Sequence, residues 1–273
     1  MKEVEVQGIP VAFEELGSGR PILLTHGWSG DHHYMMADLE PAFEGHDGWR
    51  RIYLDLPGHG ITPAPGWLGS QGQVASILTD FTDVVIGDEP FAVAGSSYGG
   101  YLSLALVRSI PQRLLGAALL VPDLPAADGT RDTTPQVTIV EDLTAFADLE
   151  EDERWIPEAL VEHSRRSLDE IRAHEMAAIR SCDRAYLERL DAHYVLGGAL
   201  ASPGAPFERP SLIATGRQDS TVGYRAQLGL LDEFPRATFA TCDLAGHWLG
   251  RVERPELFKA LVQDWLARIR TSR

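Results

Sequence analysis

The sequence predicts an α/β domain built on a mostly parallel sheet with helices on both faces. Short apolar runs alternate with stretches that place apolar residues at helical spacing, which is typical of such domains. This alternation stops near residue 123 and resumes at residue 211, so the domain is expected to be interrupted by an insertion. A length of 273 residues allows one large domain with an insertion or two small domains.

The expected strands are apolar runs bounded by Gly, Pro or polar turns. They cover residues 4–6, 11–16, 21–25, 51–56, 91–94, 115–121, 211–215 and 237–242. The expected helices have apolar residues three or four positions apart. They cover residues 33–43, 71–86, 99–110, 224–234 and 255–269.

The insertion is expected to be helical. No clear strand is found between residues 124 and 206, and helical patterns cover residues 157–168 and 169–179. Pro122, Pro125 and the loop 202–206 mark its ends. We therefore predict a core of residues 1–123 and 207–273 with a helical insertion of residues 124–206.

Charge and hydropathy narrow the possible partners. The formal net charge is −16, from 24 basic and 40 acidic residues, which argues against a nucleic acid or an anionic membrane as the partner. No apolar run is long enough to cross a bilayer, and residues 1–5 lack the apolar block of a signal peptide. A cytoplasmic protein acting on a small molecule is expected. His32 and His33 are interpreted as surface residues and not as metal ligands.

One motif predicts a nucleophile. Residues 95–99 read Gly-Ser-Ser-Tyr-Gly, which fits the pattern G-x-S-x-G, with an apolar strand before it and a helix after it. In that context Ser97 lies on a tight turn where a side chain two residues before or after it would clash. Ser96 is expected to be structural.

A serine hydroxyl needs a base to remove its proton. His247 follows the last predicted strand, and Asp219 follows the strand at 211–215, so the order along the chain is Ser, acid, His. Asp219 is expected to orient His247 and to stabilise its protonated ring. Asp123, at the end of the strand 115–121, is a possible alternative acid, and we favour Asp219.

The developing oxyanion needs two backbone N–H donors. The amides of Tyr98 and Trp28 are predicted to supply them, and the side chains of both residues are expected to line the pocket. His26 is interpreted as a brace for the Trp28 loop.

Five motifs occur in order along the chain: His26-Gly27-Trp28-Ser29-Gly30, Asp55-Leu56-Pro57-Gly58-His59-Gly60, Gly95-Ser96-Ser97-Tyr98-Gly99, Gly216-Arg217-Gln218-Asp219 and Gly246-His247. With these motifs the chain resembles the α/β-hydrolase superfamily. The resemblance implies an eight-stranded, mostly parallel sheet, a helical cap after the sixth strand at residues 124–206, and no metal or organic cofactor. Epoxide hydrolases and haloalkane dehalogenases carry Asp where this chain has Ser97, so their reactions are disfavoured.

The sequence predicts the substrate less specifically than it predicts the fold and the nucleophile. The insertion carries 8 Arg against 17 acidic residues, which disfavours anionic substrates if that charge faces the entrance. The alternative, which we favour, is that the charge lies on the solvated outer face of amphipathic helices. The leading hypothesis is hydrolysis of a small uncharged ester, thioester or lactone. Carbon–carbon bond hydrolysis of a diketone is an alternative that needs an Arg such as Arg165 or Arg166 to bind a carboxylate, and a ligand receptor is a third.

Several apolar residues of the insertion have two possible roles: they line an acyl pocket, or they hold the cap to the core. They are Phe146, Trp155, Ile156, Met176 and Tyr194.

Overall fold

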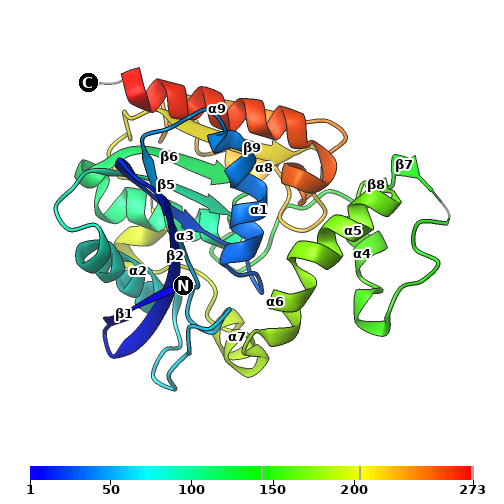
Figure 1. Ribbon diagram of the computed structural model, residues 1–273, viewed down its shortest axis with the longest axis horizontal. Coiled ribbons are helices and arrows are strands. Elements are labelled where there is room, and N and C mark those ends of the chain that lie inside the picture. Colours follow the sequence, from blue (N-terminus) through cyan, green and yellow to red (C-terminus); the bar gives the residue numbers. More distant parts are fainter. Residues whose placement is uncertain (143, 203, 272–273) are drawn as a thin grey trace.

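The structure, a computed structural model, describes residues 1–142, 144–202 and 204–271. Its centre is an eight-stranded sheet in the order β1-β2-β4-β3-β5-β6-β9-β10 (Figure 1). The strands are β1 (Lys2–Val6), β2 (Ile9–Gly17), β3 (Arg20–Thr25), β4 (Trp49–Leu54), β5 (Phe91–Ser96), β6 (Leu114–Leu120), β9 (Ser211–Gly216) and β10 (Ala237–Cys242). The predicted fold class is therefore confirmed.

All strands of the sheet except β2 run in the same direction. The β1–β2 pair and the β2–β4 pair are antiparallel, and every other neighbouring pair in the sheet is parallel. The carboxyl ends of the parallel strands therefore lie along one edge, which is where binding sites form in such sheets.

Helices cover both faces of the sheet. On one face, α1 (His32–Phe43) and α9 (Pro255–Thr271) bury one core cluster, which includes Met35, Leu39 and Trp265. On the other face, α2 (Gln71–Val85) and α3 (Tyr98–Ser109) bury a second cluster, which includes Phe81 and Leu102. The short α8 (Arg225–Leu228) precedes β10.

One predicted core helix is much shorter than expected. The pattern at 224–234 indicated a helix, but only Arg225–Leu228 are helical and the chain then runs through turns to Phe234. Leu228 and Leu231 are exposed, so the apolar spacing does not mark a buried stripe here.

The segment between β6 and β9 carries short elements that stand out to one side of the sheet (Figure 1). They are β7 (Val140–Glu141), α4 (Ile156–Ala159), β8 (Glu162–His163), α5 (Arg165–His174), α6 (Met176–Ser181) and α7 (Arg184–Asp191). The division into a core and a cap at residues 124–206 stays a prediction, and Leu143 and Pro203 lie outside the described residues.

The helix expected at 157–168 is wrong, as is the expectation of no strand in this segment. Helix α4 stops at Ala159, and Glu162–His163 pair in parallel with Val140–Glu141. Ser164 is extended and caps α5, because its hydroxyl accepts the amide of Ser167 at 3.1 Å. The Ser164 cap therefore begins a new helix within a stretch whose apolar spacing predicted one continuous helix.

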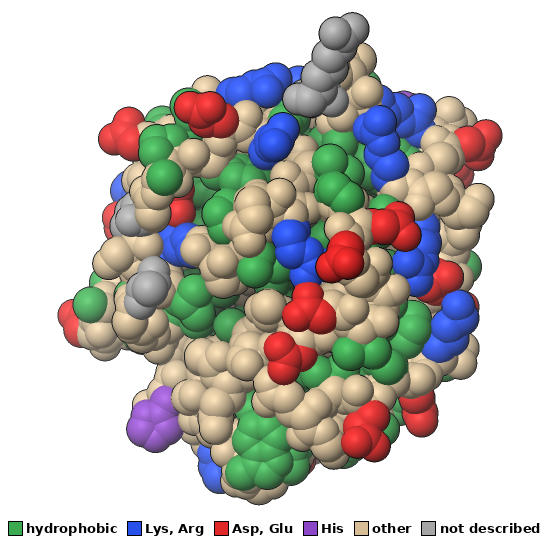
Figure 2. Space-filling model, turned by 90° about the vertical axis from the view of Figure 1, so that its left-hand side faces the viewer, with side chains coloured by type: hydrophobic (Ala, Val, Ile, Leu, Met, Phe, Trp, Pro, Cys, Tyr) green, Lys and Arg blue, Asp and Glu red, His purple; other side chains and the backbone are tan. Residues whose placement is uncertain are grey.

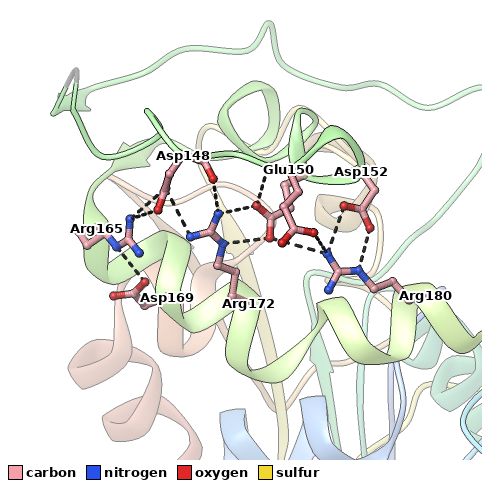
Figure 3. A network of polar contacts seen from close by, with 8 residues as sticks. Asp148, Glu150, Asp152, Arg165, Asp169, Arg172 and Arg180 are labelled. Atoms are coloured by element: carbon pink, nitrogen blue, oxygen red, sulfur yellow. Dashed lines mark hydrogen bonds and ion pairs between the residues drawn. The ribbon is translucent and has the colours of Figure 1, made fainter.

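Two kinds of contact hold these short helices together. A small apolar cluster includes Ile156, Leu168, Ile171 and Met176, and it packs on Val252 from the segment after β10. Arginines of α5 and α6 pair with acidic side chains of the preceding loop (Figure 3). The pairs join Arg165 to Asp148, Arg172 to Asp148 and Glu153, and Arg180 to Glu150 and Asp152.

Although the chain carries a net negative charge, its surface is not acidic on every side. The face in Figure 2 shows Lys and Arg side chains interspersed with Asp and Glu. Among the described residues, no helix is long and apolar enough to cross a membrane.

Glycine is required where α3 approaches β3. A Cβ on Gly95 would lie 2.2 Å from the carbonyl oxygen of Gly99 and 2.4 Å from Thr25 Oγ1. A Cβ on Gly99 would lie 2.2 Å from the carbonyl oxygen of Thr25. The carbonyl oxygens of Gly99 and Thr25 are backbone atoms that cannot turn aside, so the predicted clashes on either side of Ser97 do occur.

We expect Gly95→Ala to lower the free energy of unfolding by about 3 kcal/mol, the upper part of the usual overpacking range. The control is Gly72→Ala in α2, where a Cβ meets nothing within 4 Å. This change should raise the free energy of unfolding by about 0.5–1 kcal/mol. Urea denaturation followed by circular dichroism measures both, and equal effects would contradict the steric argument.

Candidate active site

Ser97 occupies the sharp turn between β5 and α3. Its backbone lies in the left-handed region, with φ 53° and ψ −117°, and a non-glycine residue holds such a conformation only where its surroundings enforce it. The Ser97 amide donates to Leu120 at 2.9 Å, and its carbonyl accepts the amides of Tyr101 and Asp123. The turn is therefore fixed by β6 on one side and by α3 on the other.

The structure brings Ser97, His247 and Asp219 together. His247 Nε2 lies 2.9 Å from Ser97 Oγ, and His247 Nδ1 lies 2.9 Å from Asp219 Oδ2. The carboxylate of Asp219 is fully buried, and its Oδ1 accepts the amides of Thr221 and Val222. With Nδ1–H donating to Asp219, the lone pair of Nε2 faces the Ser97 hydroxyl.

The environment of His247 raises the pKa of its ring. Burial lowers the pKa of His247, but the nearby Asp219 carboxylate outweighs that effect, and the net pKa lies above its ordinary value. Asp123 and Glu175 add smaller contributions in the same direction. The imidazole can therefore take a proton from Ser97 and hold it as a stabilised cation.

The alternative acid is close to Ser97 but is occupied by another partner. The Asp123 amide donates to the carbonyl of Ser97 at 3.1 Å. Its carboxylate forms two hydrogen bonds with Arg131, from Nε and from one terminal nitrogen, both at 2.7 Å. Because His247 hydrogen-bonds to Asp219, Asp219 is the carboxylate placed to orient the ring.

The two predicted oxyanion donors, the amides of Trp28 and Tyr98, belong to segments that lie next to Ser97. Tyr98 opens α3, and Gly27, the residue before Trp28, is so close that a Cβ on it would lie 3.4 Å from the Cβ of Ser97. In the described part of the chain, neither the Trp28 amide nor the Tyr98 amide has a hydrogen-bond acceptor. Both N–H groups are thus free to bind an oxygen atom of a ligand.

The Tyr98 side chain does not line the pocket as expected. Its ring is buried beneath the site, and its hydroxyl donates to Gln71 at 2.6 Å. The Trp28 ring does reach the pocket, and it packs edge-on against Tyr98 at 5.0 Å. The first residue of α3 points its side chain into the core because that face of the helix packs against α2.

Two histidines brace the loops beside Ser97. His26 is buried, with Nδ1 2.8 Å from the Gly27 carbonyl and Nε2 accepting the Leu56 amide at 3.0 Å, as the bracing role predicts. His32, expected at the surface, is instead buried against the carboxylate of Asp55 at 2.8 Å. The hydropathy pattern does not predict that His32 and Asp55 are buried together, because both side chains are polar.

In the described part of the chain, Asp31, His32 and His33 have donor atoms within 4.8 Å of one another. Such a set could ligate a metal, but His32 already bonds Asp55 and His33 bonds Asp31.

A cavity of about 240 Å³ opens directly on Ser97 and His247. Its lining includes four Trp and Tyr side chains and one carboxylate, that of Glu175. The aromatic side chains are those of Trp28, Tyr34, Trp155 and Trp248. Sequence reasoning missed Glu175 because a lone Glu between two helical patterns has no distinguishing context.

A second cavity, of about 360 Å³, also reaches Ser97 and His247. It is lined by Asp123, Arg131 and Tyr194 among others. Arg131 stacks over the Tyr194 ring at 4.8 Å while it binds Asp123. Among the described residues of this lining, the one arginine is therefore already paired with a carboxylate.

The five apolar residues of the insertion do not separate cleanly into the two roles considered. Trp155 and Tyr194 line the cavities. Ile156 and Met176 are buried in the cluster that packs on Val252, and Phe146 and Trp155 pack against that cluster. Tyr194 belongs to the core cluster that includes Phe81 and Leu102, so Trp155 and Tyr194 serve both roles.

Comparison with known proteins identifies the family. The family model described as alpha/beta hydrolase fold matches residues 20–250. An alpha/beta superfamily hydrolase from Oenococcus oeni PSU-1 has the same fold, with a TM-score of 0.87 at 24% identity over 99% of this chain and 100% of that one.

Curated relatives have different hydrolytic activities. The 2-hydroxy-6-oxo-2,4-heptadienoate hydrolase of Pseudomonas putida is 28% identical over 95% of this chain and 94% of the relative. The pimeloyl-[acyl-carrier protein] methyl ester esterase of Legionella pneumophila is 29% identical over 38% of each chain. Two other relatives are the dihydrolipoyllysine-residue acetyltransferase components of the acetoin cleaving systems of Cupriavidus necator and Pseudomonas putida. They are 35% and 32% identical over 43% and 44% of this chain, which spans about a third of their length.

The parallel sheet, the turn at Ser97 and the match over residues 20–250 lead to one conclusion. The chain belongs to the α/β-hydrolase fold family.

Proposed function

We propose that the protein is a serine hydrolase that cleaves a small carboxylic ester, thioester or lactone carrying no anionic group. The observation that carries this proposal is the pair of 2.9 Å hydrogen bonds that link Ser97 to His247 and His247 to Asp219. Ser97, His247 and Asp219 are proposed as the catalytic residues. No cofactor and no metal is part of the proposal.

In the proposed mechanism His247 Nε2 removes the Ser97 proton as Oγ attacks the carbonyl carbon. The carbonyl oxygen becomes negatively charged, and the free amides of Trp28 and Tyr98 stabilise it, which is commonly worth about 3–4 kcal/mol per donor. His247 then gives its proton to the leaving oxygen or sulfur. Water, deprotonated by the same imidazole, attacks the acyl-enzyme and regenerates Ser97.

The cavity supports a small substrate without a negative charge. About 240 Å³ lies below the usual range for drug-sized ligands, about 300–1,000 Å³. The described lining of this cavity contains Glu175 but no Lys or Arg, and the arginine that pairs with Glu175, Arg251, lies outside that lining. An anionic group would therefore pay a desolvation cost with no cation to receive it.

Carbon–carbon bond hydrolysis is the second candidate, favoured by the full-length similarity to the heptadienoate hydrolase. Such a substrate carries a carboxylate, and the arginines considered from sequence do not receive it. Arg165 pairs with Asp148 and Asp169 at the surface, and Arg166 bonds the Arg251 and Val252 carbonyls. Arg131 lines the second cavity, but its guanidinium already forms two hydrogen bonds with the Asp123 carboxylate, so its charge is balanced before a substrate carboxylate arrives.

A substrate comparison tests the choice between these two activities and the receptor alternative. Wild-type protein should hydrolyse p-nitrophenyl acetate and butyrate faster than a dienoate ring-fission product, and Ser97→Ala should abolish the ester turnover. A fluorophosphonate probe followed by mass spectrometry should label Ser97. Preferred turnover of the dienoate would favour the second candidate, and an unlabelled Ser97 in native protein would favour a receptor.

Asp219→Asn should lower kcat by about 10⁴-fold while the fold is retained, because the amide cannot hold the imidazole in the same tautomer. The matched control is Asp123→Asn, which removes an equal charge from a carboxylate bound to Arg131 and should lower kcat less than tenfold. Steady-state kinetics on p-nitrophenyl acetate, with circular dichroism for folding, measures both. If the Asp123 variant shows the larger loss, the assignment of the acid is wrong.

The activity should also depend on pH through His247. Only the neutral ring can accept the Ser97 proton, so kcat/KM should rise with pH through an apparent pKa above the ordinary His value of 6.5. Asp219→Asn removes the carboxylate that raises this pKa, and the acidic limb should move to lower pH. A pH–rate profile with a limb that does not respond to Asp219 would contradict the proposed base.

A further inference from the structure

Glu175 is an unusual group to find next to the predicted nucleophile. It joins α5 to α6, its side chain is 9% exposed, and it lines the same cavity as Ser97 and His247. Trp248 Nε1 donates to both of its oxygens, at 2.9 and 2.8 Å. The carboxylate is thus fixed in position and not free to turn away from the cavity.

The positive charge beside Glu175 is shared with other carboxylates. Arg251 donates to Glu175 at 2.7 Å and to Asp38 at 2.6 Å, and Glu170 lies 3.6 Å from its Nε. Asp38 can approach so closely because residue 250 is Gly, where a Cβ would lie 2.8 Å from Asp38 Oδ2. One guanidinium therefore faces three carboxylates, and the cluster is negative as a whole.

Burial raises the pKa of Glu175, although Arg251 and Trp248 oppose that effect. The carboxylate is therefore incompletely compensated by its neighbours, and a cation entering the cavity would stabilise its charged form.

The remaining walls of the cavity are suited to a cation. Trp248 and Trp155 lie with ring centroids 5.4 Å apart, and Trp28 and Tyr34 line the same space. Trp248 is oriented by its bond to Glu175, and Trp28 by its edge-on contact with Tyr98. Aromatic faces around a carboxylate attract ammonium groups through the ring quadrupole, most strongly when water is excluded.

We propose that this cavity binds an ammonium group carried by the substrate, with Glu175 as the counter-charge and Trp28, Trp155 and Trp248 as the aromatic walls. The inference rests on the proposed function, because it names the substrate class of the Ser97 site. It narrows that class to small esters, thioesters or lactones with a cationic substituent. Glu175 is then a specificity-determining residue.

Binding can be tested without turnover. We expect tetramethylammonium to bind the wild-type protein at least about tenfold more tightly than tert-butanol, a neutral molecule of similar shape, in calorimetric titrations. Glu175→Gln should weaken tetramethylammonium binding by about tenfold and leave tert-butanol binding nearly unchanged. The control Glu158→Gln removes the same charge from an exposed position of α4 and should change neither.

Trp155→Leu is a second variant that keeps the charge cluster intact, in case Glu175→Gln does not fold. It should weaken tetramethylammonium binding more than tert-butanol binding, because only the cation gains from the ring face. Among substrates, the ratio of kcat/KM for acetylcholine to that for 3,3-dimethylbutyl acetate should fall about tenfold in Glu175→Gln relative to wild type.

Equal binding of tetramethylammonium and tert-butanol would overturn the inference, as would equal losses in the Glu175 and Glu158 variants. The proposed function fails in a different way. If tetramethylammonium binds as expected but no ester is hydrolysed and Ser97 takes no fluorophosphonate, the cation site stands and the hydrolase proposal falls. If esters are hydrolysed without cation preference, the reverse holds.

Discussion

The chain of hydrogen bonds from Asp219 through His247 to Ser97 is the interaction on which the account depends. Its three members follow β9, β10 and β5, so they are far apart in the sequence and adjacent at one edge of the sheet. The parallel register of β9 with β10 sets where the Asp219 and His247 loops start. The glycines at 95 and 99 let α3 pack close enough to β3 for the Ser97 turn to form.

A buried glutamate, Glu253, fixes the loop that carries His247. Glu253 accepts the Gly246 amide at 2.6 Å and the Val161 amide at 2.9 Å, so one carboxylate joins the His247 loop to the insertion. Burial raises the pKa of Glu253 to about 7. The Asp38–Arg251–Glu175 cluster makes a second such connection, from α1 through the segment after β10 to the α5–α6 junction. The position of the base and the shape of the cavity are therefore set by the same polar contacts.

Much of the fold could be predicted from periodicity and turns. The strand at 237–242 and the helices after 70 and after 254 lie within two residues of the predicted bounds. The two helices were predictable because each has a long apolar face with helical spacing. The insertion was harder, since its elements are only two to ten residues long and depend on local caps such as Ser164 and on pairs such as Arg172 with Glu153.

The residues of the site were also only partly predictable from the sequence. Ser97, His247 and Asp219 could be placed from motifs tied to strand ends, and the structure brings these three side chains within hydrogen-bond distance. Glu175, Trp248 and Arg251 could not be found, because the contacts that join them link residues 73 and 76 positions apart and belong to no motif. The burial of His32 against Asp55 escaped prediction for the same reason: a buried polar pair leaves no hydropathy signal.

A crystal structure of the protein after reaction with a fluorophosphonate would show whether Ser97, His247 and the two amides act on one ligand. We expect phosphorus bonded to Ser97 Oγ, His247 Nε2 beside it, and one phosphonyl oxygen about 2.7–3.1 Å from the amides of both Trp28 and Tyr98. An adduct on another residue, or a phosphonyl oxygen directed to solvent with His247 still bonded to Asp219 but turned from Ser97, would contradict this expectation.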